Sequence, residues 1–195
     1  MTMTHREFLE EGFGQSAWID LVNSENWDGF DHLTDHLADQ SWISLYLRHW
    51  HLDQPPGVVH LDELTNLRVF LRAFVERWVT RRALTAEDVG VINEALSVPV
   101  RRIFKRDAQA CAIHLEPLRP GKRWLRAQIV ESLAHGFTEH GAERIKMCPN
   151  RGCRWVFYDR THGNTRKWCS ARLCGNREWV RRAREVSKRG PLQSE

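Results

Sequence analysis

Four cysteines in the last quarter of the chain have a spacing typical of metal ligands. They form two Cys-x4-Cys pairs, CPNRGC and CSARLC, with fifteen residues between the pairs. Paired thiolates at such short spacing bind Zn²⁺, and four of them complete its tetrahedral coordination. We therefore predict one structural zinc ion per chain, with Cys148, Cys153, Cys169 and Cys174 as its ligands.

Three alternatives compete with this prediction. The four cysteines could be ordinary buried residues without a metal, or His162 could replace one of them as a ligand. A catalytic zinc would need an open coordination position and commonly a His or carboxylate ligand. Because four thiolates close the coordination shell, the pattern favours a structural site.

The residues around the cysteines predict the elements that hold them. Gly152 lies within the first pair and Gly175 directly follows the second, where we expect tight bends whose N–H groups point at sulfur. The segment 154–169 predicts two short strands around a loop at 162–164, and the second pair leads into a helix that ends near Lys188. This order predicts a treble-clef-like finger, which has too little apolar surface to fold without its metal.

Charge divides the chain at about residue 140. Residues 141–195, here called the finger, contain 14 Lys and Arg against 5 Asp and Glu, whereas residues 1–140, the body, contain 15 against 20. The body is therefore net acidic and the finger strongly basic. Such a basic segment predicts a polyanionic partner.

Basic side chains recur at helical spacing after the second cysteine pair. Arg177, Arg181, Arg184 and Lys188 are separated by four, three and four residues, so they share one helix face. We predict that this face meets the phosphates of DNA. The predicted contacts are Arg160, Arg166, Lys167, Arg177, Arg181, Arg182, Arg184 and Lys188.

Other interpretations of the basic surface stay open. It could be a solvated face, a counter-charge to the zinc thiolates, or a site for an acidic protein partner. RNA is a further alternative, with Trp168 or Tyr158 as surfaces on which bases stack.

The body has the patterns of an α+β unit that is mostly helical. Apolar residues at spacings of three and four predict helices at about 35–51, 60–82 and 122–140, and the apolar segment 16–24 predicts a short one. Thr85 and Asp88 have the form of a capping box for a helix that ends near 97. The segments 100–104 and 111–115 predict a β-hairpin, in which Cys111 is a small buried residue.

The sequence contains no apolar run of about 18 residues, and Met1–Glu10 lacks the apolar stretch of a signal peptide. We therefore expect a cytoplasmic protein without a membrane partner.

Nothing in the body matches a nucleophile motif, a phosphate loop or a dinucleotide fingerprint, so we expect no catalysis. His32 and His36 could bind a metal from one helix face, although a polar face explains them equally well. A sensor for a small-molecule or protein effector is a further hypothesis for the body. Asp20 and Asn23 are its most distinctive polar residues, and capping or a turn is their expected role.

The segment CSARLCGNREWVRRARE, preceded by CPNRGCRWVFYDRTHGNTRKW, resembles the bacterial CGNR zinc-finger family, with Cys174, Gly175, Asn176 and Arg177 as the motif. Upstream, SAWIDLVNS resembles the opening of its partner, the ABATE domain. The resemblance covers nearly the whole chain. It implies an ABATE-like body, a zinc finger and a role as a stress-induced transcriptional regulator.

Overall fold

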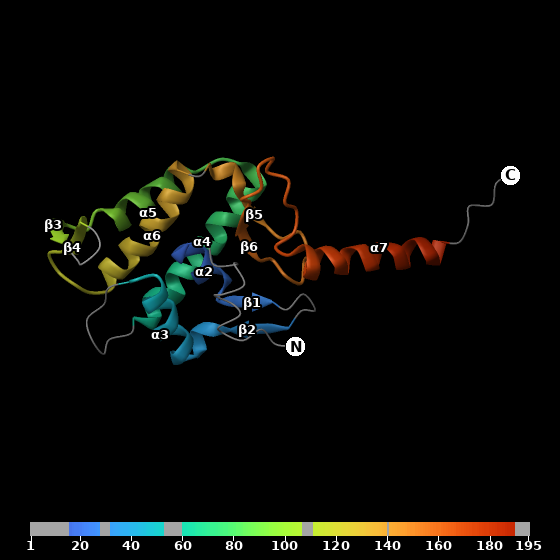
Figure 1. The fold of residues 1–195 in the computed structure, drawn as a ribbon, viewed down its shortest axis with the longest axis horizontal. Helices are drawn as coiled ribbons and strands as arrows, with labels where there is room; N and C mark the ends of the chain where they lie inside the picture. The colour runs from blue at the N-terminus through green and yellow to red at the C-terminus, as the bar shows by residue number, and fades with distance from the viewer. Residues whose placement is uncertain (1–15, 28–31, 53–59, 107–110, 140, 190–195) are drawn as a thin grey trace.

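The structure, a computed structural model, describes residues 16–27, 32–52, 60–106, 111–139 and 141–189. The fold is α+β and 57% helical, with small two-stranded antiparallel sheets. Figure 1 shows the helices of the body together at the centre, a hairpin at one end and a long C-terminal helix that projects from the other end. None of the helices among the described residues has the length and apolar character needed to span a membrane.

The short helix α2 (Ala17–Asn23) lies at the centre of the fold, and all seven of its residues are buried. It packs against α4 (Leu61–Arg81), α6 (Lys122–Thr138) and strand β6 (Val156–Tyr158). Ser132 of α6 accepts a hydrogen bond from the N–H of Trp18 (3.1 Å), which would otherwise be unpaired at the start of the helix. The predicted helix at 16–24 is therefore present, and tertiary contacts complete it.

The apolar stripes that predict the longer helices face the same core. In α4 the predicted helix begins and ends within one residue of 60 and 82, and Leu64, Leu67 and Leu71 are buried. The segment predicted as one helix at 35–51 divides into the 3-10 helix η1 (His36–Ala38) and α3 (Gln40–His49).

Side-chain caps and one ion pair fix the smaller elements. The predicted capping box is present, because Thr85 and Asp88 bond each other's backbone N–H at the start of α5 (Ala86–Leu96). Strands β1 (Glu25–Trp27) and β2 (Leu33–Asp35) form a hairpin next to η1. Arg68 of α4 holds the end of this hairpin through a bidentate ion pair with Asp35 (2.6 and 2.8 Å).

The predicted hairpin consists of β3 (Val100–Arg106) and β4 (Cys111–Pro117), at the opposite end of the molecule from the C-terminal helix (Figure 1). The prediction that Cys111 is buried is wrong, because its side chain is exposed at the start of β4. Phe104 and Ile113, which pair across the strands, are also exposed. The apolar residues of this hairpin are therefore not core residues, since the two strands extend beyond the core.

The finger contains the 3-10 helix η2 (Ala142–Arg144), strands β5 (Ile145–Met147) and β6, a π-helical turn η3 (Ala171–Gly175) and the helix α7 (Asn176–Arg189). Its apolar residues Val156 and Phe157 belong to the same buried cluster as Leu67 and Leu133 of the body. Body and finger therefore share one continuous core.

Candidate metal centre

Backbone elements of different types carry the four cysteines. Cys148 and Cys153 lie in the turn between β5 and β6, and the N–H of Cys148 donates to the carbonyl of Trp155 (2.8 Å), which extends the hairpin into the turn. Cys169 follows an irregular loop. Cys174 lies in the π-helical turn that leads directly into α7.

The geometry of the four sulfur atoms fits one Zn²⁺ ion. All four Sγ atoms lie within 4.8 Å of one another, and Cys169 Sγ is 3.6 Å from both Cys153 Sγ and Cys174 Sγ. A tetrahedral site with Zn–S bonds of about 2.3 Å requires sulfur–sulfur distances of about 3.8 Å. All four side chains are buried, so the ion would be closed off from solvent and serve a structural role.

Electrostatics also favours a cation at this position. Hydrogen bonds from neighbouring thiols, first that of Cys153, lower the pKa of Cys148, whereas the contact with Cys148 raises the pKa of Cys169. Four thiols this close cannot ionise together without a positive charge between them. A zinc ion would supply that charge and hold all four as thiolates.

The glycines near the cysteines have other roles than those predicted. The N–H of Gly152 donates to Asn150 Oδ1 (3.1 Å) and that of Gly175 to the carbonyl of Ser170 (3.0 Å), so neither points at sulfur. At Gly175 a Cβ would come within 3.2 Å of the Trp168 ring, which explains the small residue there. The sulfur contact comes instead from Asn150, whose Nδ2 lies 3.7 Å from Cys174 Sγ.

The two strands predicted around residues 162–164 are wrong in part. Residues 156–158 form β6, but β6 pairs with β5 before the first cysteine pair, and the described residues 159–170 contain no strand. The buried carboxylate of Asp159 holds this loop in place of the hydrogen bonds that a second pair of strands would form. It accepts hydrogen bonds from the Nζ of Lys146 (2.6 Å) and from the backbone N–H groups of Thr161 (2.9 Å) and Arg166 (2.7 Å).

Asp159 and Lys146 were not singled out from the sequence. A lone Asp in a basic segment is usually a solvated residue, and only the loop's path shows that it is buried. Burial raises the pKa of Asp159, but the hydrogen bonds from Lys146 and Thr161 outweigh this and hold the pKa well below its usual range. Lys146 also donates to the carbonyls of Asn164 and Arg166 (2.8 and 2.9 Å), so one ion pair organises the loop that leads to Cys169.

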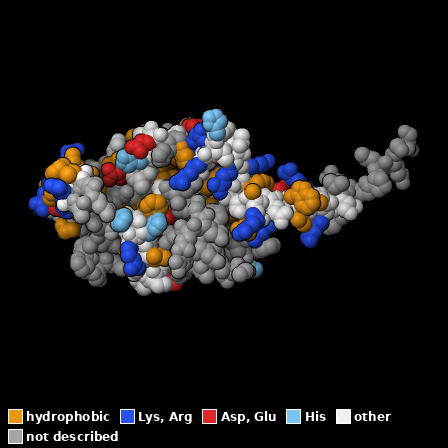
Figure 2. Space-filling model, viewed as in Figure 1, with side chains coloured by type: hydrophobic (Ala, Val, Ile, Leu, Met, Phe, Trp, Pro, Cys, Tyr) orange, Lys and Arg blue, Asp and Glu red, His pale blue; other side chains and the backbone are white. Residues whose placement is uncertain are grey.

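The structure separates the basic residues predicted from the sequence into two groups. Arg166 is half-buried, with its guanidinium over the Phe157 ring (4.7 Å) and bonded to the carbonyls of Trp168 and Cys169, so it stabilises the finger. The others described are at least partly exposed, on the loop or on α7: Arg160, Lys167, Arg177, Arg181, Arg182 and Arg184. The side chain of Lys188 lies outside the described residues. Figure 2 shows Lys and Arg side chains over the finger and along the projecting helix.

The finger is attached to the body through Asn23, which neither caps a helix nor forms a turn as expected. Its Nδ2 donates to the carbonyl of Val156 (2.8 Å) and its Oδ1 accepts from the N–H of the same residue (2.9 Å). Arg72 of α4 adds a hydrogen bond to the carbonyl of Arg154 (2.8 Å), and Arg154 forms an ion pair with Glu76. An Asn side chain thus takes the place of a neighbouring strand beside β6.

The remaining candidate residues do not join the metal centre. Within the described residues, the four cysteines form the only cluster suited to a metal, and His162 lies on an exposed loop outside it. His36 is buried and stacks on Trp42 (centroids 5.6 Å apart). Asp20 is fully buried and accepts a hydrogen bond from the Nε1 of Trp50 (2.8 Å).

Comparison with known families agrees with this arrangement. The family described as "CGNR zinc finger" matches residues 144–186, and the ABATE family, described as "Putative stress-induced transcription regulator", matches residues 15–140. Neither description names an enzyme. A search among curated proteins found no match. The chain therefore belongs to the ABATE family, and it carries a C-terminal CGNR zinc finger whose four cysteines fit one Zn²⁺ ion.

Proposed function

We propose that the protein is a zinc-dependent transcriptional regulator of the cytoplasm that contacts DNA through its finger. In this proposal residues 1–140 sense a signal, and residues 141–195 form a treble-clef-like DNA-binding unit. The turn between β5 and β6 carries the first two ligands, and the π-helical turn that leads into the last helix carries the fourth, an order that supports a treble-clef-like arrangement.

The position of α7 is the main support for this proposal. This helix projects from the body, as Figure 1 shows, and the exposed side chains of Arg181, Arg182 and Arg184 follow one another along it. The described part of the chain contains no element packed along its outer turns. A projecting basic helix can reach the phosphates of a duplex without moving the body.

Ion pairs within α7 are compatible with this role. Arg181 bonds Glu178 and Glu185, and Arg182 bonds Glu178. Hydrogen bonds from the two arginines lower the pKa of Glu178 to about 2. Because both arginine side chains are largely exposed, water screens these pairs and phosphates can replace the carboxylates at little cost.

The test is a titration of the zinc-loaded chain with labelled duplex DNA at about 50 and 200 mM salt, followed by fluorescence anisotropy. We expect affinity to fall steeply with salt, and Arg184→Ala to reduce the slope of log K against log salt by about 1. Arg123→Ala, which removes an exposed arginine of the body, is the matched control and should leave the slope unchanged. Undetectable binding at low salt would refute DNA binding, and equal slopes for both variants would refute contact with DNA through Arg184 of α7.

A protein-interaction role is the second candidate, and the exposed side chain of Trp179 favours it. This indole is 69% exposed on α7, and exposed tryptophans are common anchors in protein interfaces. In this alternative the basic helix meets an acidic protein and the zinc is purely structural. Trp179→Ala would then abolish capture of that partner while DNA affinity stays at a non-specific level.

A further inference from the structure

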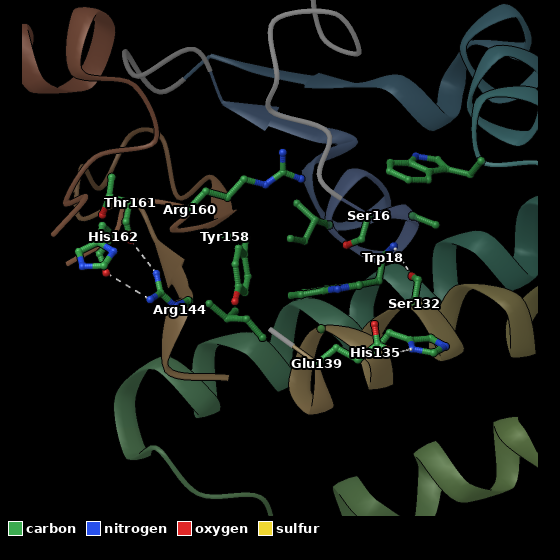
Figure 3. A pocket seen from close by; sticks show the side chains of 15 residues that line it. Ser16, Trp18, Ser132, His135, Glu139, Arg144, Tyr158, Arg160, Thr161 and His162 are labelled. Atoms are coloured by element: carbon green, nitrogen blue, oxygen red, sulfur yellow. Dashed lines mark hydrogen bonds and ion pairs between the residues drawn. The ribbon is translucent and has the colours of Figure 1, made fainter. Parts of the chain in front are cut away.

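A cavity of about 710 Å³ lies where the body meets the finger. Its walls come from α2 and α6 of the body and from β5, β6 and the following loop of the finger. The volume is in the range of sites that bind small organic ligands. Figure 3 shows Tyr158 and Arg160 of the finger on one side of this space and Ser16 and Trp18 of the body on the other.

One part of the wall is apolar and aromatic. Trp18 and Ile19 of α2, Trp50 after α3, and Ile145 and Tyr158 of the finger strands line it. Planar rings of this kind stack on planar apolar ligands. This part therefore favours a ligand with an aromatic body.

The charged part of the wall is net positive. Arg144 is fixed by hydrogen bonds to the carbonyls of Thr161 (2.7 Å) and His162 (3.4 Å), as the dashed lines in Figure 3 mark. Arg160 forms no ion pair or hydrogen bond with any residue that the structure describes. The acidic residue on the wall, Glu139, already accepts a bond from His135 (2.7 Å). An anionic group on a ligand could therefore form an ion pair with the guanidinium of Arg160.

Two buried polar atoms on the wall strengthen the case for a ligand. Ser16 Oγ and Trp18 Nε1 have no hydrogen-bond partner among the described residues. Leaving such groups unpaired costs about 1–3 kcal/mol each, so buried polar groups normally have partners. Both can donate a hydrogen bond, and a carboxylate is a strong acceptor.

We propose that this cavity is a binding site for a small aromatic carboxylate, with Arg160 as the residue that recognises its charge. The site belongs to the body and the finger together. Because Arg160 also lies on the proposed DNA surface, a bound carboxylate would withdraw it from the phosphates and weaken DNA binding. This consequence alone rests on the proposed function, and reciprocity requires DNA to weaken ligand binding by the same factor.

The experiment is calorimetric titration of the full zinc-loaded chain with indole-3-acetate and with its neutral counterpart indole-3-acetamide, without DNA. We expect the acid to bind about tenfold or more tightly than the amide, as for one charge-assisted hydrogen bond. Arg160→Ala should remove this preference. Arg172→Ala, an exposed finger arginine away from the cavity, should keep it.

Equal binding of acid and amide, or equal effects of the two arginine variants, would overturn the site. If circular dichroism shows that Arg160→Ala is misfolded, Ser16→Ala decides instead, because it removes only a hydroxyl that has no partner among the described residues. It should weaken acid binding severalfold, and wild-type affinity would overturn the site.

Repeating the DNA titration with saturating acid separates the two proposals. A lower DNA affinity supports coupling through Arg160, and an unchanged DNA affinity refutes the coupling. A chain that binds the acid but no DNA would refute the proposed function and leave the ligand site standing.

Discussion

Asp20 should make the protein less stable as the pH rises toward neutrality. Its side chain is fully buried in α2, and burial raises its pKa from 3.8 to about 7, although the hydrogen bond from Trp50 opposes the shift. Between these two pH values the folded state holds a proton that the unfolded chain releases. The contribution of Asp20 to stability is therefore greatest below pH 4, falls as the pH rises from 4 to 7, and is constant above that.

The size of this effect on the free energy of unfolding follows from the pKa shift of Asp20. Each pKa unit corresponds to about 1.4 kcal/mol, so ionised Asp20 destabilises the fold by about 4 kcal/mol relative to the protonated form. In Asp20→Asn the amide oxygen can still accept from Trp50, but no charge forms. Burial of the amide nitrogen costs about 1–3 kcal/mol at every pH. Relative to wild type, we expect the free energy of unfolding of the variant to rise by about 3 kcal/mol between pH 4.5 and pH 8, because part of the full difference already appears below pH 4.5.

The assay is urea unfolding of zinc-saturated protein by tryptophan fluorescence at several pH values in this interval. Comparing variant with wild type at each pH cancels the titration of the cysteines and of other groups. Asp62→Asn on the exposed start of α4 is the matched control, and its difference from wild type should stay constant. If the difference between Asp20→Asn and wild type is also constant, the buried ionisation of Asp20 is refuted.

Three further predictions concern the finger and its attachment. Cys169→Ser should lose the zinc ion in native mass spectrometry, whereas Cys111→Ser, at an exposed cysteine outside the cluster, should retain it. Asn23→Ala leaves the backbone N–H and carbonyl of Val156 without partners and should lower the free energy of unfolding by about 3 kcal/mol, measured in urea. Asp159→Asn should destabilise the chain by about 3 kcal/mol at pH 7, because it leaves a lysine unpaired in a half-buried site. Since the folded pKa of Asp159 is depressed, this deficit should persist above pH 4 and shrink in urea titrations as the pH falls below that value.

Patterns in the sequence determined those features of the protein that depend only on residues close together in the chain. The two Cys-x4-Cys pairs predict a zinc site because short loops bring their thiols together whatever surrounds them. The stripe of α4 and the capping box at Thr85 were predicted for the same reason, since a helix period and a cap depend on residues three or four apart. Together with the hairpin predicted at 100–104 and 111–115, these helices give the α+β class.

Only the tertiary structure decided which polar residues are buried and what they bind. Asn23 and Val156 are 133 residues apart, and nothing near either of them indicates their hydrogen bonds. The exposure of Cys111, the network around Asp159 and the cavity between body and finger likewise depend on how distant segments pack. Spacing along the chain specifies helices, turns and metal ligands, whereas burial and charge pairing arise from contacts that form only when the core assembles.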